Sequence, residues 1–149
     1  MSDGKPTARV FKYEKPAFGE GKQIVKLART DRMLANLQVL KEGGENNLHA
    51  HGHLDGFWML LGGRARFYGE GDVLLADLGP NEGILIPRNF KYWFESSGDT
   101  DLEILQVEAF DMAINDDQTL LRDRISYAPM TQGQLPGEHV MHDASAPKT

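Results

Sequence analysis

The sequence predicts an all-β protein whose strands form one barrel or sandwich. Two observations carry this prediction. Short apolar runs follow one another at intervals of about ten residues, and residues typical of turns, chiefly glycine, proline, asparagine and serine, separate them. The chain has 149 residues, the size of one domain that can bury its own core.

The chain begins with a segment that we expect to be a loop or an edge-strand arm. Residues 1–22 contain prolines and glycines and show little periodicity. Between Gln23 and Leu40 the apolar residues fit either two strands or one short helix, and the alternation over Ala35–Val39 favours a strand. The paired glycines of Lys41–Gly44 then predict a turn.

The middle of the chain is the most regular, and we expect the barrel to cover residues 23–112. The strands expected after the first turn are Leu48–Leu61, Arg64–Tyr68, Val73–Leu78, Ile84–Ile86, Tyr92–Glu95 and Leu102–Phe110. A hairpin turn is expected at Gly69–Asp72. In the last part, 113–149, Asn115 could cap a short helix, and the polar composition from Ser126 onward predicts a loosely ordered tail.

Composition and charge argue against several classes of partner. The formal net charge is −6, and no basic stripe is present to neutralise the phosphates of a nucleic acid or an anionic membrane. The chain has no cysteine, which excludes disulfides, thiolate metal ligands and a cysteine nucleophile. The first residues lack an apolar signal core, and no stretch approaches the ~20 apolar residues that span a bilayer. We therefore expect a cytoplasmic protein that acts on a small molecule.

Three of the five histidines stand at alternate positions, His49, His51 and His53, and Asp55 follows them. In a regular strand these four side chains share one face. Imidazole and carboxylate are the ligands of non-haem iron and related metal sites. The same alternation continues into three apolar residues, Phe57, Met59 and Leu61. Such a face resembles a barrel interior that is polar at its mouth and packed at its base, so the histidine run predicts a metal or catalytic site.

The same residues resemble the first motif of the cupin superfamily. That motif has a glycine, five residues, a His-x-His pair, three or four residues, a glutamate, six residues and a glycine. Here Gly43, His49, His51 and Gly62 match at these spacings, and Asp55 stands at the acidic position. The match is specific, with aspartate for glutamate as its one substitution.

The second cupin motif is degenerate in this chain. Aligned on Pro87, its second glycine falls on Asn89, its histidine on Tyr92 and its asparagine on Ser96. Asparagine tolerates the left-handed conformation that the glycine supplies, so Asn89 suits the turn. Tyr92 replaces the histidine that is usually the fourth metal ligand.

The resemblance implies a small single-domain cupin, a double-stranded β-helix (jelly-roll) barrel, and a homodimer. It implies a divalent metal, iron, zinc, nickel or manganese, held by His49, His51, His53 and Asp55, with Tyr92 and His53 as catalytic residues. The expected reaction is metal-assisted oxidation, lysis or isomerisation of a small organic acid or carbonyl compound. Two alternatives stay open. One is a metal-free acid-base isomerase or epimerase that uses the histidines and Tyr92, and the other is a cupin that only binds a ligand.

Overall fold

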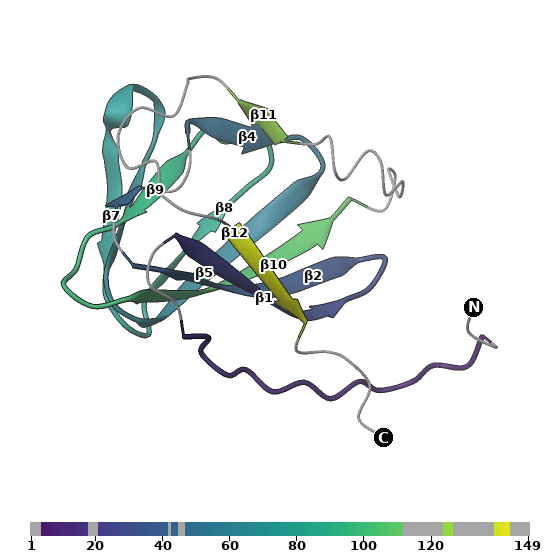
Figure 1. Cartoon of the computed structure of the whole chain (residues 1–149). Coiled ribbons are helices and arrows are strands. Elements are labelled where there is room, and N and C mark those ends of the chain that lie inside the picture. The colour runs from purple at the N-terminus through teal and green to yellow at the C-terminus, as the bar shows by residue number, and fades with distance from the viewer. Residues whose placement is uncertain are drawn as a thin grey trace.

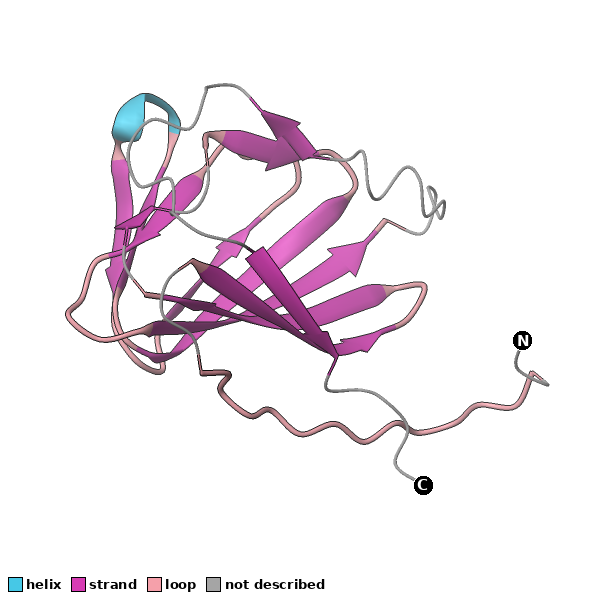
Figure 2. Cartoon of the chain, in the orientation of Figure 1, coloured by secondary structure: helices cyan, strands magenta, loops and turns pink. Residues whose placement is uncertain are grey.

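The computed structural model describes residues 4–17, 21–41, 43–44, 47–111, 124–126 and 139–143. Strands make up nearly all of the regular structure in these ranges, and they surround a common interior (Figure 1). The single helical element among them is a 3-10 turn, η1, Glu70–Asp72, visible at one end of the molecule in Figure 2. No helix in the described ranges is long and apolar enough to cross a membrane. The all-β prediction is confirmed.

One wall of the barrel is a six-stranded sheet in the order β12-β1-β2-β10-β5-β8. Its strands are β1 (Lys22–Arg29), β2 (Met33–Leu40), β5 (Leu54–Gly62), β8 (Gly83–Ile86), β10 (Leu102–Phe110) and β12 (His139–Asp143). All neighbours are antiparallel except β1 and β12, which are parallel.

The opposite wall is a four-stranded sheet in the order β3-β9-β6-β7, with a two-stranded sheet of β11 and β4 beside it. Its strands are β3 (Gly43–Gly44), β6 (Ala65–Tyr68), β7 (Leu74–Leu78) and β9 (Trp93–Ser96), and the small sheet has β4 (His49–His51) and β11 (Arg124–Ser126). The hairpin between β6 and β7 turns through η1, as the sequence predicts. Two walls joined by antiparallel strands in this way form a double-stranded β-helix.

The interior between the two walls is apolar at one end. Its largest fully buried side chains come from both sheets, so they tie the walls together. They include Phe67, Phe94, Leu60, Leu102 and Ile104. The rings of Phe67 and Phe94 stack with their centroids 5.0 Å apart, a favourable offset for aromatic pairs.

The six-stranded sheet also has an apolar outer face. Val25, Leu37 and Val39 are buried there in a second cluster, and Tyr13 of the N-terminal arm packs against it. The arm, residues 4–17, contains no strand or helix and runs along this side of the sheet (Figure 1). The Tyr13 hydroxyl donates a hydrogen bond to Glu103 Oε1 at 3.2 Å, and Lys15 Nζ lies 2.9 Å from Asp101 Oδ2.

The observed strands β6 to β10 begin and end within one residue of their predicted bounds. The stretch Gln23–Leu40 forms two strands rather than a helix. The predicted turn at Lys41–Gly44 is wrong for its two glycines, because they pair with Ser96 and Glu95 of β9 as strand β3.

The loosely ordered tail is likewise wrong for Ser126, the last residue of a strand that pairs with β4, and for His139–Asp143, which pairs with β1. The expected helix at Asn115 lies outside the described residues.

Candidate functional site

His49 and Tyr92 face each other in the interior, next to the aromatic core, because the Tyr92 ring centroid lies 6.3 Å from that of Phe67 and 6.4 Å from that of Trp58. Their backbones form a pair of hydrogen bonds, His49 N–H to Tyr92 O at 3.1 Å and Tyr92 N–H to His49 O at 2.9 Å. Side chains directly opposite in an antiparallel pair share one face. The two rings are in contact, with centroids 4.4 Å apart, and the residues are only 2% and 3% exposed.

A break after β4 divides the predicted histidine face. The chain leaves the strand at Gly52 and His53 and resumes as β5 at Leu54, which reverses the order of inward and outward positions. In β5 the buried residues are Leu54, Gly56, Trp58 and Leu60, whereas Asp55, Phe57 and Leu61 are exposed. The prediction that His49, His51, His53 and Asp55 share one face is therefore wrong beyond His51. Gly52 and His53 belong to neither strand, and they shift the alternation of inward and outward side chains by one position.

Asp55 and His53 consequently do not join His49 and His51. The Asp55 carboxylate points to the loop after β8, where its Oδ1 accepts a hydrogen bond from the Arg88 N–H at 3.0 Å. The backbone carbonyl of His53 accepts one from the Asp111 N–H at 2.7 Å, and its side chain does not line the interior pocket. Asn89, in the same loop, has φ of +68°, so the predicted left-handed turn is confirmed.

The predicted donor set does not fit a metal ion as it stands. Within the described ranges, no three His, Asp or Glu side chains come close enough together to hold one. His49 and His51 are neighbours, with ring centroids 5.2 Å apart. The Nδ1 of His49 lies 2.7 Å from the carbonyl oxygen of Asn47, and since a carbonyl only accepts, this contact selects the tautomer with the proton on Nδ1.

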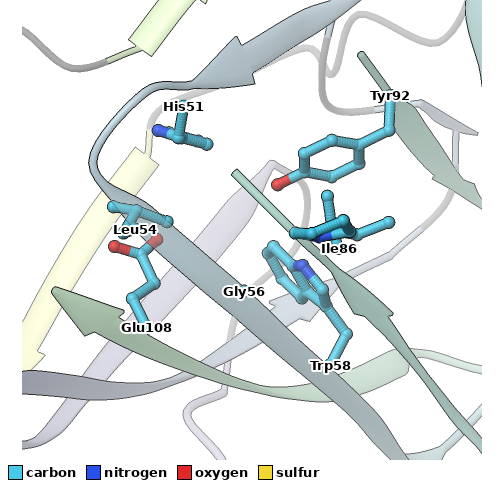
Figure 3. A pocket seen from close by; sticks show the side chains of 8 residues that line it. His51, Leu54, Gly56, Trp58, Ile86, Tyr92 and Glu108 are labelled. Carbon is cyan, nitrogen blue, oxygen red and sulfur yellow. The ribbon is translucent and has the colours of Figure 1, made fainter. Parts of the chain in front are cut away.

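A pocket opens beside these residues, between β4, β5, β8 and the Tyr92 end of β9 (Figure 3). The empty space among its lining residues, with the open solvent at its mouth included, is about 230 Å³, and it contains no enclosed cavity of water size. It is lined by His51, Leu54, Gly56, Trp58, Ile86, Pro87, Tyr92 and Glu108. In Figure 3 the Tyr92 hydroxyl points into the space that His51 and Glu108 border from the other side, and the Trp58 ring lies beside this space.

Glu108 is the site residue that the sequence analysis missed. It lies on β10 directly opposite Gly56 of β5. The first cupin motif places its acidic residue at position 55 or 56 of this chain, depending on whether three or four residues follow the His-x-His pair. Of these two positions only 56 faces the interior, and a glycine occupies it. The neighbouring strand thus brings a carboxylate to the place where β5 lacks one. The signal for it was present, since Gln106 and Glu108 continue the inward alternation of Leu102 and Ile104.

A chain of buried amides orients this carboxylate. Gln38 Nε2 on β2 donates a hydrogen bond to Gln106 Oε1 at 2.7 Å, and Gln106 Nε2 in turn donates to Glu108 Oε1. Gln38 and Gln106 are 5% and 9% exposed, so this polar chain crosses the interior of the sheet away from water. Buried polar groups of this kind fix one geometry when they are paired.

Trp58 brings a buried donor to the pocket. It is 2% exposed, and its Nε1 has no hydrogen-bond partner among the described residues. A side-chain carbon at Gly56 would lie 3.3 Å from this nitrogen, so glycine keeps the space in front of the indole N–H open. The second tryptophan differs, because Trp93 Nε1 donates to Asp72 Oδ1 at 2.9 Å. A buried unpaired donor costs on the order of 1–3 kcal/mol, which a ligand with an acceptor atom would recover.

The comparisons with known proteins agree with this architecture. No family model matches the chain. The Cnp3 cupin domain of Schizosaccharomyces pombe aligns with a TM-score of 0.60 at 15% identity, over 76% of this chain and 81% of that one. A cupin superfamily protein of Desulfitobacterium hafniense aligns with a TM-score of 0.55 at 22% identity, over 65% and 84%. The chain therefore has the cupin fold.

Two further matches have names that mention small molecules. The Streptomyces PAC13 protein, solved with uridine, aligns with this chain at a TM-score of 0.60 and 11% identity, over 85% of this chain and 95% of that one. Mannose-1-phosphate guanylyltransferase of Escherichia coli is 29% identical over 94 residues, which is 63% of this chain. The match spans only 19% of that enzyme's length.

Proposed function

We propose that this cupin binds a small polyhydroxy or carbonyl compound in the pocket and transfers protons on it without a metal. The observation that carries the proposal is the convergence of groups from three strands and a loop on one small space. Trp58 supplies an unpartnered donor, and His51, Tyr92 and Glu108 supply groups that can give or take a proton.

The chemistry follows from what each group can do. A base removes a proton from the carbon beside a carbonyl while an acid protonates the carbonyl oxygen, which gives an enol. The protonated base then returns its proton to the former carbonyl carbon, while the deprotonated acid takes the hydroxyl proton of the neighbouring carbon. A new carbonyl forms at that neighbouring carbon, and both groups regain their starting protonation states, so atoms and charge balance. We assign the base to Glu108 or His51, the acid to Tyr92, and the anchoring hydrogen bond to the Trp58 N–H.

The similar proteins support the ligand class. PAC13 was solved with uridine, and the guanylyltransferase is named for mannose 1-phosphate. Both molecules carry a sugar ring with several hydroxyls. A pocket with one fixed donor and groups that both donate and accept suits such a ring.

Deuterium exchange tests the proposal. The purified cupin is incubated in D₂O with fructose 6-phosphate or dihydroxyacetone phosphate, and loss of the C–H signal beside the carbonyl is followed by NMR. We expect exchange that is at least tenfold slower in Glu108→Gln, since one general acid-base group contributes ~10²–10⁴-fold. Glu95→Gln is the matched control, because Glu95 bonds Tyr68 on the opposite wall and does not line the pocket. Exchange that is absent, or equal in both variants, contradicts the proposal.

A divalent metal is the second candidate, and the proximity of His49 and His51 favours it. Iron, zinc, nickel or manganese would be held by these two imidazoles and would supply Lewis acidity when bound. Metal analysis of the purified protein separates the candidates. A stoichiometric metal that is lost in both His49→Ala and His51→Ala would replace the metal-free proposal. The acidic, cysteine-free composition supports a cytoplasmic location for either activity.

A further inference from the structure

The amides that hold Glu108 form a chain with one direction. Gln38 Nε2 donates a hydrogen bond to Gln106 Oε1 at 2.7 Å, and Gln106 Nε2 donates to Glu108 Oε1. Both donors therefore point toward the carboxylate. At the other end of the chain, Gln38 Oε1 is buried and has no hydrogen-bond partner among the described residues. The direction of the chain thus gives the carboxylate a donor and leaves one amide oxygen unpaired.

The opposite direction would suit a protonated Glu108. If both amides were turned over, Gln106 Nε2 would donate to Gln38 Oε1, and this oxygen would gain a partner. Gln106 Oε1 would then face Glu108, and an amide oxygen can bond a carboxyl group only when the carboxyl carries a proton. The observed direction therefore belongs to the ionised carboxylate. A hydrogen bond to a charged group is stronger than a neutral one, so the bond to Glu108 offsets the oxygen left unpaired at Gln38.

We propose that Gln106 and Gln38 are positioning residues that hold Glu108 ionised, so that Glu108 rather than His51 is the base of the pocket. The role of base rests on the proposed function, in which the choice between these two groups is open. Apolar pocket walls disfavour a charged carboxylate, and a donated N–H favours it. Gln38 acts through Gln106, because it occupies Gln106 Oε1 and so prevents this amide from turning its oxygen toward the carboxylate.

The other ionisable groups near Glu108 are few. Among the described residues that line the pocket, they are His51 and Tyr92. The strands β5 and β8 bring only uncharged residues to this space. On β2, the buried polar side chains that face the interior beside β10 are the amides Asn36 and Gln38. Replacing an amide of the chain therefore changes the surroundings of the carboxylate without removing a charge.

The pH titration of the Glu108 carboxyl tests the proposal without a substrate. In protein labelled with ¹³C at the glutamate carboxyl carbons, the Glu108 NMR signal is identified by its loss in Glu108→Gln. Methionine has the length of glutamine but no N–H. We expect Gln106→Met to move the titration midpoint to higher pH by roughly one unit, because donated N–H groups favour the ionised form by about this much each. Gln38→Met should move it less, and should add nothing to Gln106→Met, because Gln38 acts only through Gln106.

Gln23→Met is the matched control. Gln23 is a buried glutamine of the same sheet, 6% exposed, but it pairs with Val39 on the outer face, so the midpoint should stay in place. A midpoint that does not move in Gln106→Met, or that moves equally in Gln23→Met, overturns the proposal. So does a deuterium-exchange rate whose fall at acidic pH does not follow the midpoint in these variants, because His51 would then be the base. Exchange that is absent from the wild type, with the midpoint moving as expected, contradicts the proposed function alone.

Discussion

Replacement of Gly83 by alanine tests whether β8 is held against β5 as closely as the structure places it. Gly83 begins β8 and pairs with Met59. A side-chain carbon there would lie 2.1 Å from the carbonyl oxygen of Trp58 and 3.2 Å from the Cα of Met59. Both are backbone atoms that cannot rotate away, so β8 must move away from β5.

The expected cost follows from what that movement disrupts. Losing about two ladder hydrogen bonds costs roughly 1 kcal/mol each. Partial exposure of Ile86, which is 5% exposed at the end of β8, adds roughly 1 kcal/mol. We therefore expect Gly83→Ala to lower the free energy of unfolding by roughly 2–4 kcal/mol. Urea denaturation followed by tryptophan fluorescence measures this difference.

Gly71→Ala is the control for this experiment. Gly71 has φ of +73°, and a side-chain carbon there meets nothing within 4 Å. Its substitution therefore carries only the conformational strain of an L residue at positive φ, about 1–2 kcal/mol. A Gly83→Ala variant that loses no more stability than Gly71→Ala would refute the close approach of β8 to β5.

Two further predictions concern stability. Phe67→Ala should lower the free energy of unfolding by about 3–5 kcal/mol, because Phe67 is fully buried between the walls. Urea denaturation measures this loss. Phe90→Ala is the control and should show no such loss, because the Phe90 side chain is partly exposed. Burial tends to raise the pKa of Asp101, but hydrogen bonds from Lys15 and Lys41 outweigh it and hold the pKa below its ordinary value. The stability from this carboxylate is therefore present above its unfolded pKa near ~3.9 and is lost as the pH falls through the folded value. Asp101→Asn should be less stable than wild type at pH ~7, with the difference shrinking below pH ~4. A difference that stays constant from neutral to acidic pH would contradict the assignment.

The strands of the barrel could be predicted because their signals are local. Turn residues bound each strand from β6 to β10, and alternation identifies the faces within a strand. Asn89 was predictable for the same reason, since its conformation depends on residue type and on the turn itself. The pairing of β11 and β12 depends on partners far away in the sequence, so a polar composition gave no sign of it.

The site was only partly predictable, and one break in a strand explains why. His49, His51 and Tyr92 lie where the motifs indicate. The alternation was extended through Gly52 and His53, where the ladder is interrupted, so Asp55 was placed on the wrong face. Sequence spacing alone does not show which residues face inward after such a break, because the alternation of inward and outward side chains can change there.

Glu108 could not be predicted from the motifs for a different reason. It is brought to the pocket by the register between β10 and β5, which pairs it with Gly56. Register is a property of two strands that are distant in the chain, and no local motif records it. The two inward polar residues on β10, Gln106 and Glu108, were the available indication, because they interrupt an otherwise apolar core face.

The indole signals of the two tryptophans test the central claim most directly. In ¹⁵N-labelled protein, each Nε1–H gives one NMR signal, and Trp58→Phe identifies which is which. Trp93 Nε1 already bonds Asp72 and serves as the internal control. On titration with uridine or mannose 1-phosphate, we expect the Trp58 signal to move in a saturable way as its N–H gains an acceptor, while the Trp93 signal stays in place. A Trp58 signal that stays fixed with both probes, or that moves only together with Trp93, would contradict a ligand site in this pocket.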